Sequence, residues 1–120
     1  MKRLLFVYGT LKRGAKNHRH LAGQNFVSPA RTIPGFELRD MGGYPGLVPC
    51  AQDPAGVTGE VWSVDAAALQ RLDRFEGVDQ GLYRRARIAL GGEFTAAEVD
   101  AYFPVEPVTG PSLGGTWRED

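Results

Sequence analysis

The segment Leu4-Leu5-Phe6-Val7-Tyr8-Gly9-Thr10-Leu11 is an apolar run that breaks at a glycine, and the rest of the predicted fold is arranged around it. The run Leu4–Tyr8 is too short for a helix and is rich in aliphatic and aromatic residues, so we predict a buried first strand. A strand that ends in Gly-Thr exposes successive backbone N–H groups, which can bind an anion. A plain strand-end turn would produce the same pattern.

Length and composition predict one soluble domain over residues 1–120 with a core that buries about two-thirds of the unfolded surface. Lys plus Arg and Asp plus Glu number 14 each, which argues against a general nucleic-acid-binding surface. The lone Cys50 cannot form an internal disulfide, so a reducing, cytoplasmic location is expected. The first apolar run stops at Gly9, short of what a secretory signal needs, and no stretch is long enough to span a bilayer.

One helix stands out, over Ala66–Phe75. Asp65 can cap its N-terminus, and Gly77 can end it in the left-handed conformation. Four apolar residues share one face at helical spacing and are expected to be buried. These are Ala68, Leu69, Leu72 and Phe75.

Most of the remaining elements are predicted to be strands. They are Ile33–Leu38, Gly59–Val64, Tyr83–Leu90 and Phe94–Phe103, and a glycine-rich turn separates the first of them from the short apolar pair Leu47-Val48. Gly91-Gly92 suggests a hairpin between the last two, and the tail after Pro104 is rich in turn residues, with Trp117 as a possible anchor. No crossover helix follows the first strand, which disfavours a doubly wound parallel sheet and both dinucleotide and P-loop sites. We therefore predict an α+β domain built on a small curled β-barrel with one or two flanking helices.

An ordered set of motifs covers most of the chain. It comprises Tyr8-Gly9-Thr10-Leu11-Lys12-Arg13-Gly14, Asn17-His18, Gly59-Glu60-Val61-Trp62, Leu72-Asp73, Phe75-Glu76-Gly77 and Tyr83-Arg84-Arg85. In order and spacing, residues 6–102 resemble the γ-glutamylcyclotransferase-like family, in its γ-glutamylamine cyclotransferase and AIG2-like branch. The resemblance implies a small β-barrel flanked by helices, a cavity at one mouth, and cyclisation of a γ-glutamyl group to 5-oxoproline with release of an amine. The Tyr-Gly-Thr-Leu form of the first loop, in place of Tyr-Gly-Ser-Asn, favours a γ-glutamylamine or another γ-glutamyl amide as substrate.

The same resemblance assigns roles to seven residues. Glu76 would be the general acid/base, because the substrate's α-ammonium must lose a proton before it can attack. We expect the end of the helix and Asp73 to raise the pKa of Glu76. The remaining six would bind substrate: Tyr8, Gly9, Thr10 and Leu11 through the loop, and Tyr83 and Tyr102 as aromatic residues near the cavity. For both Tyr83 and Tyr102, packing on a strand face with the hydroxyl at the surface is the alternative.

Several functions are not expected. His18 and His20 lack further metal-ligand spacing, so we predict no metal, and the chemistry requires no cofactor. The basic run Lys12–His20 lacks interleaved aromatic residues and is interpreted as a solvated loop, not a nucleic-acid site. The expected partner is a small γ-glutamyl substrate bound by a monomer. A non-catalytic ligand-binding or interaction domain on the same fold is the competing hypothesis.

Overall fold

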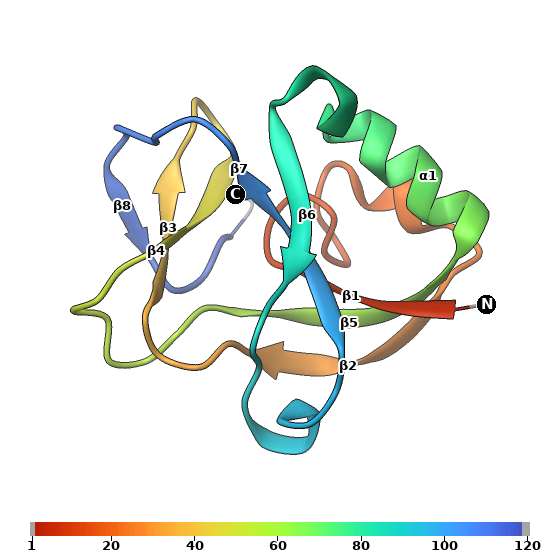
Figure 1. Cartoon of the computed structure of the whole chain (residues 1–120), viewed down its shortest axis with the longest axis horizontal. Coiled ribbons are helices and arrows are strands. Elements are labelled where there is room, and N and C mark those ends of the chain that lie inside the picture. Colours follow the sequence, from red (N-terminus) through yellow and green to blue (C-terminus); the bar gives the residue numbers. More distant parts are fainter. Residues whose placement is uncertain (1, 119–120) are drawn as a thin grey trace.

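The computed structural model describes residues 2–118 and consists of two sheets and one α-helix (Figure 1). The strands are β1 (Lys2–Val7), β2 (Asn25–Arg31), β3 (Phe36–Asp40), β4 (Pro45–Pro49), β5 (Thr58–Asp65), β6 (Tyr83–Arg87), β7 (Val99–Pro104) and β8 (Ser112–Gly114). The helices are α1 (Ala66–Phe75) and three 3-10 turns, η1 (His18–Leu21), η2 (Val78–Gln80) and η3 (Gly92–Phe94).

Strand β1 lies at the centre of the larger sheet, whose order is β2-β5-β1-β7-β6. It pairs antiparallel with β5 and parallel with β7. Leu5 and Val7 point to the core beneath α1, whereas Phe6 and Tyr8 point to the core on the opposite face. Both faces of the strand are therefore covered, which explains its unbroken apolar sequence and confirms the predicted buried first strand.

The smaller sheet, in the order β4-β3-β8, lies beside the curled larger sheet (Figure 1). Leu38 and Leu47 from the smaller sheet pack in the same core as Phe6 and Val61 from the larger one. The edge strands of the larger sheet are β2 and β6. Just past their C-terminal ends, the two chain segments meet in an isolated β-bridge between Thr32 and Leu90. The α+β class is confirmed, but the two sheets do not close into a barrel.

Helix α1 has the predicted bounds and caps. The Asp65 carboxylate accepts a hydrogen bond from the Ala68 N–H at 2.8 Å, and Gly77 has a φ of 70°. Leu72 is fully buried, as predicted, but Phe75 is 42% exposed and the prediction that it belongs to the buried face was wrong. Phe75 ends the helix and stacks on His20, with 4.1 Å between ring centroids, so it lies beside the core and not in it.

The strands that differ from the prediction include two that lie at sheet edges, β2 and β8. β2 and β8 were not predicted, because neither has an apolar run: β2 alternates exposed and half-buried residues and contains Pro29, and β8 is only three residues long. β2 pairs with β5, and β8 pairs with β3. The predicted Phe94–Phe103 strand begins only at Val99, after η3. Trp117 packs against the core, in agreement with its predicted anchoring role. No helix within residues 2–118 is long and apolar enough to cross a membrane.

Candidate active site

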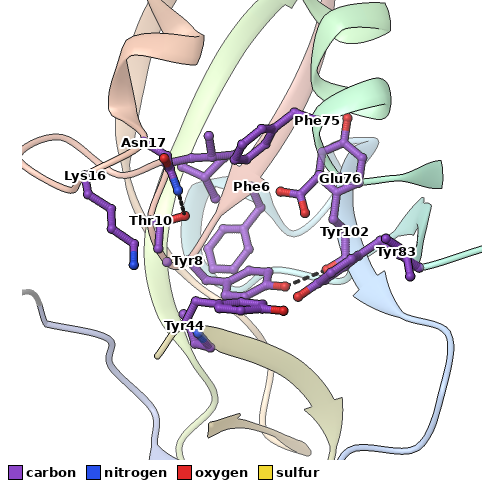
Figure 2. Close-up of a pocket in the computed structure, with 15 residues that line it drawn as sticks. Phe6, Tyr8, Thr10, Lys16, Asn17, Tyr44, Phe75, Glu76, Tyr83 and Tyr102 are labelled. Carbon is purple, nitrogen blue, oxygen red and sulfur yellow. Dashed lines mark hydrogen bonds between the residues drawn. The ribbon is translucent and has the colours of Figure 1, made fainter. Parts of the chain in front are cut away.

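A cavity of about 290 Å³ lies where β1 ends beside the C-terminus of α1 (Figure 2). Fifteen residues line it: Phe6, Val7, Tyr8, Gly9, Thr10, Leu11, Lys16, Asn17, Tyr44, Pro45, Phe75, Glu76, Leu82, Tyr83 and Tyr102. All seven residues that the sequence nominated as site residues are among them. The fold thus brings the first loop, the helix end and two later strands to one small concave site.

The first loop presents backbone donors to this cavity. Among the described residues, none accepts a hydrogen bond from the N–H groups of Gly9, Thr10 or Leu11. A Cβ at Gly9 would lie 2.6 Å from Cγ of Pro45, so only glycine permits this close approach. Asn17 holds the loop from the other side, because its N–H donates to the Thr10 carbonyl at 2.9 Å and its Nδ2 donates to Thr10 Oγ1 at 3.0 Å. Three successive N–H groups without an acceptor among the described residues are therefore available to a ligand.

A buried carboxylate secures the end of the same loop. Glu60 Oε1 accepts hydrogen bonds from the Arg13 N–H at 3.0 Å and from Trp62 Nε1 at 3.1 Å. The Arg13 side chain pairs with Glu60 Oε2 at 3.2 Å and lies over the ring of Phe26. These contacts limit movement of the donors, so their positions are set before any ligand arrives.

Glu76 lies across the cavity from Thr10 (Figure 2). It is the C-cap residue of α1, and its N–H donates to the Leu72 carbonyl at 2.9 Å. None of the described residues donates a hydrogen bond to its carboxylate, and burial raises the pKa of Glu76 from 4.5 to about 7. A carboxyl group with this pKa can both take and return a proton near neutral pH.

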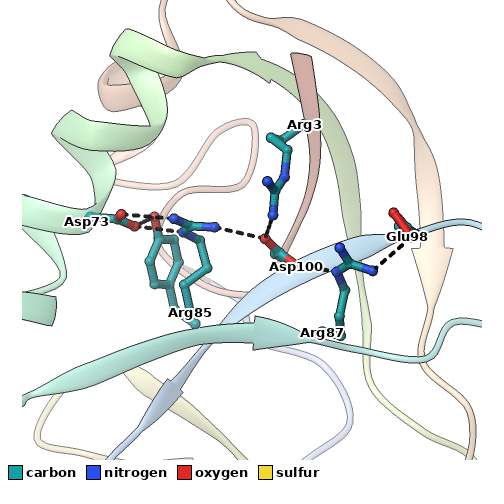
Figure 3. A network of polar contacts seen from close by, with 7 residues as sticks. Arg3, Asp73, Arg85, Arg87, Glu98 and Asp100 are labelled. Carbon is teal, nitrogen blue, oxygen red and sulfur yellow. Dashed lines mark hydrogen bonds and ion pairs between the residues drawn. The ribbon is translucent and has the colours of Figure 1, made fainter. Parts of the chain in front are cut away.

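Asp73 does not contribute to that shift, contrary to expectation. Its carboxylate accepts hydrogen bonds from Arg85 Nε at 2.9 Å and from the Tyr102 hydroxyl at 2.7 Å. Arg85 also donates to Asp100, which in turn binds Arg3 and so connects the helix to the larger sheet (Figure 3). Asp73 therefore faces a network of cations and donors, and burial alone accounts for the raised pKa of Glu76.

The tyrosine hydroxyls of the site point inward. Tyr8 donates to the Tyr102 carbonyl at 2.8 Å, and Tyr83 donates to Met41 Sδ at 2.9 Å. Burial is the main cause that raises the pKa of Tyr8, Tyr83 and Tyr102, and the nearby Glu76 carboxylate raises the pKa of each further. Tyr83 and Tyr102 are 9% and 3% exposed, so the alternative of surface-facing hydroxyls does not hold. All three are neutral hydrogen-bonding groups at physiological pH.

Several lining residues had not been proposed as site residues. They are Phe6, Val7, Lys16, Asn17, Tyr44, Pro45, Phe75 and Leu82. Asn17 belongs to a motif that carried the family resemblance, and its spacing from Thr10 was a usable signal. Tyr44 lies in a glycine-rich turn between β3 and β4, and nothing in the local sequence indicates that this turn lies against β1.

A second cavity of about 430 Å³ adjoins the first and shares Tyr44, Leu82 and Tyr83 with it. Its other lining residues are Asp40, Met41, Pro104, Glu106, Pro107, Val108, Thr109 and Gly110. The lining is largely apolar and carries two carboxylates, with no lysine, arginine or histidine among these residues. The outer cavity therefore suits an apolar group that is neutral or positively charged.

The two histidines have structural partners. His18 Nδ1 lies 2.9 Å from the Leu11 carbonyl oxygen, and its ring contacts Trp62 with 5.2 Å between centroids. His20 stacks on Phe75. Across the described part of the chain, no group of three or more His, Cys, Asp or Glu residues is placed to hold a metal ion.

Comparison with known proteins adds independent information. The family model described as "Gamma-glutamyl cyclotransferase, AIG2-like" matches residues 5–119. A Vibrio cholerae protein provisionally named a γ-glutamylcyclotransferase is 43% identical over 88 residues, which are 73% of this chain and 73% of that protein. The human γ-glutamylaminecyclotransferase is 39% identical over 89 residues, or 68% of this chain and 58% of the human protein. This chain thus spans less than two-thirds of the human relative's length.

Among solved structures, an AIG2-like protein from Mus musculus superposes on this chain with a TM-score of 0.68 and 28% identity. The superposition covers 92% of this chain and 80% of the mouse protein. The arrangement of two sheets and a helix is therefore shared with that protein.

Proposed function

The chain belongs to the γ-glutamyl cyclotransferase, AIG2-like family of enzymes, and we propose that it converts a γ-glutamyl amide to 5-oxoproline and a free amine with Glu76 as general acid/base. One observation carries the mechanism. The Glu76 carboxyl group, with a pKa of about 7, lies across a 290 Å³ cavity from a loop with three available N–H donors.

The anchored group is the substrate's α-carboxylate. The N–H groups of Gly9, Thr10 and Leu11 bind it, and the cationic Lys16 on the same side of the cavity adds favourable charge. This anchor directs the neighbouring α-ammonium toward Glu76. With one end of the substrate held, the flexible glutamyl chain is restricted to folded conformations in which its amine and its γ-carbonyl can meet.

Glu76 then acts twice. It first accepts a proton from the α-ammonium, and the freed nitrogen attacks the γ-carbonyl carbon to form the C–N bond of the five-membered ring. The bond from that carbon to the departing amine then breaks, and Glu76 returns the proton to the departing nitrogen. The ring nitrogen loses its second proton in the same step, so the products are the lactam with one N–H and the amine in its ammonium form, and Glu76 is a carboxylate again. Nucleophile and electrophile belong to one molecule, so the protein contributes mainly orientation and proton transfer.

The outer cavity favours γ-glutamylamines over γ-glutamyl amino acids as substrates. The outer part of glutathione or of a γ-glutamyl dipeptide has a net negative charge, which Asp40 and Glu106 would repel. An amine with an apolar body, or the net-neutral end of an ε-linked lysine, fits the same lining. The name of the human relative, a γ-glutamylaminecyclotransferase, agrees with this preference. A single-domain, monomeric, cytoplasmic enzyme without cofactor stays our prediction for the protein as a whole.

The direct test is release of 5-oxoproline from γ-glutamyl-ε-lysine, γ-glutamyl dipeptides and glutathione. We expect Glu76→Gln to lower kcat/KM by ~10²–10⁴-fold, the usual contribution of a positioned acid/base. Asp79→Asn is the matched control, because it makes the same change of acid to amide at an exposed residue that lines neither cavity.

The outcomes separate the hypotheses. Release that persists in Glu76→Gln would exclude Glu76 as the acid/base. Binding of γ-glutamyl compounds without release by the wild type would support the non-catalytic ligand-binding domain instead.

A further inference from the structure

The two cavities share three lining residues, and the boundary that these residues form indicates where the reacting amide of a substrate would lie. The inner cavity holds Glu76 and the anion-binding loop, and the outer cavity opens beyond it. If the proposed function is right, the γ-glutamyl group occupies the inner cavity and the amine occupies the outer one. The scissile amide must then lie at the boundary, beside the shared residues Tyr44, Leu82 and Tyr83.

Tyr44 and Tyr83 are the polar members of this boundary, and both have protons that they can offer. Tyr83 donates to the thioether sulfur of Met41, a weak acceptor that is readily exchanged for a better one. Within residues 2–118 no group accepts a hydrogen bond from the Tyr44 hydroxyl. The proton of Tyr8, by contrast, is committed to the Tyr102 carbonyl at 2.8 Å, and Tyr8 lines only the inner cavity.

The hydroxyls of Tyr8, Tyr44 and Tyr83 gather on one side of the Glu76 carboxylate (Figure 2). Burial is the main cause that raises the pKa of Tyr83, and the nearby Glu76 and Tyr44 raise it further. Tyr83 therefore keeps its proton at neutral pH. A γ-carbonyl placed between Glu76 and these rings would have its carbon on the side of the proton acceptor and its oxygen within reach of the phenol donors.

Tyr44 is held in place although 41% of its surface is exposed. Its turn is closed by Asp40, whose Oδ1 accepts the N–H groups of Gly42 and Gly43 at 2.9 Å each. Both glycines have positive φ values, 108° and 97°, which a residue with a side chain would rarely adopt. The Tyr44 carbonyl accepts the Met41 N–H at 2.8 Å, so the ring projects from a tight, hydrogen-bonded turn.

We propose that Tyr44 is a further catalytic residue, whose hydroxyl donates, together with that of Tyr83, to the γ-carbonyl oxygen of the substrate. When the α-nitrogen attacks, the carbonyl π electrons move onto this oxygen, and the two hydrogen bonds strengthen as its negative charge grows. When the C–N bond to the amine breaks, the carbonyl re-forms and both tyrosines keep their protons. The two donors are placed for the charge of the transition state, so they act chiefly on kcat.

The test uses Tyr44→Phe, Tyr83→Phe and the double variant, which remove hydroxyls and keep the rings. We expect Tyr44→Phe to lower kcat by ~10-fold or more, the double variant by ~10²–10³-fold, and KM to change by less than about twofold. Tyr44→Leu serves to separate the ring from the hydroxyl and is expected to raise KM as well. Thr95→Val removes a hydroxyl that lines neither cavity and should leave both constants unchanged.

Thermal unfolding of each variant controls for stability. Tyr44→Phe should unfold as the wild type does, since its hydroxyl has no partner among the described residues to lose. Wild-type turnover with an unchanged kcat in Tyr44→Phe, or an effect confined to KM, would overturn the role of Tyr44 and leave the proposed function standing. Absence of 5-oxoproline release from the wild type would overturn the proposed function and this inference together.

Discussion

Two carboxylates near the end of α1, three residues apart, have opposite surroundings. Asp73 accepts a bidentate pair from Arg85, at 2.9 and 3.2 Å, and a hydrogen bond from Tyr102 at 2.7 Å. Glu76 receives no hydrogen bond from any described residue, and burial raises its pKa to about 7. Asp73 is a structural link between helix and sheet, whereas Glu76 has no such partner within residues 2–118, which is why we propose it as the group that transfers protons.

The difference shows that position on a helix does not decide what a carboxylate does. Asp73 lies in the last turn of α1 and meets Arg85 and Tyr102 on adjacent strands β6 and β7. Glu76 is the first residue after the helix and precedes the turn at Gly77. Its side chain lines the cavity, whereas that of Asp73 faces the sheet. Hydrogen-bond donors make Asp73 part of the packed structure, whereas burial without such donors in the described part of the chain raises the pKa of Glu76.

The largest effect that tests this comparison is the pH dependence of activity. Because the pKa of Glu76 is raised to about 7, the base form is lost as the pH falls through that value. We expect kcat/KM to drop about tenfold per pH unit below the midpoint, or ~100-fold over two units. A midpoint near the ordinary glutamate pKa of 4.5 in a pH–rate profile would show that Glu76 is solvated, as an exposed residue would be.

A smaller effect is expected from Asp73→Asn. This change removes one of the two carboxylate partners of the Arg85 guanidinium and leaves Asp100 as the other, while the side chain of Arg85 stays largely covered, at 24% exposed. The free energy of unfolding should fall by ~2 kcal/mol, below the full cost of breaking a buried pair because both groups are partly exposed. Chemical denaturation measures it, and a loss of activity without loss of stability would contradict a structural role.

The smallest effect, and one of opposite sign, is expected from Glu76→Gln. The folded-state pKa of about 7 exceeds the ordinary 4.5, so the wild type has its full stability below about pH 4.5 and loses stability as the pH rises to about 7. Gln does not titrate, so the variant should be more stable than the wild type by ~1–2 kcal/mol at about pH 8 and show little gain at about pH 5. This value is discounted from the full shift because the residue is only half-buried.

The free energy of unfolding of Asp73→Asn, measured at the same two pH values, is the control for Glu76→Gln. Asp73→Asn should show no comparable gain at high pH, since its carboxylate is already satisfied by Arg85 and Tyr102. A Glu76→Gln variant that is less stable than the wild type at both pH values would mean that Glu76 makes stabilising contacts.

The predicted elements that agree with the structure are those with strong local signals. The bounds of α1 followed from the Asp65 cap, the apolar spacing and Gly77, and the burial of β1 followed from an apolar run too short for a helix. β2 and β8 escaped prediction because β2 has no buried apolar run and β8 has only three residues, so the strand signal in the sequence is weak. Pro29 within β2 is tolerated because the strand lies at the edge of its sheet.

The site shows the same division. Gly9 and Thr10 belong to one short sequence motif and Glu76 to another, and these motifs led to their prediction as site residues. All three line one cavity. Tyr44 was missed because its approach to β1 depends on the position of the β3–β4 turn. The expectation that Asp73 raises the pKa of Glu76 was wrong because Asp73 pairs with Arg85, which lies 12 residues away in the sequence and reaches Asp73 only in the folded chain.

The sequence by itself therefore determined the central strand, the helix, the donor loop and the presence of a glutamate at the helix end, since each is marked by a local pattern of residue types. Only the tertiary structure decided which carboxylate has hydrogen-bond donors and which is buried without any among the described residues, and which tyrosines meet at the boundary of the two cavities. The physical reason is that desolvation and hydrogen-bond satisfaction depend on groups brought together from distant parts of the chain, and these contacts exist only once the sheets and the helix have packed.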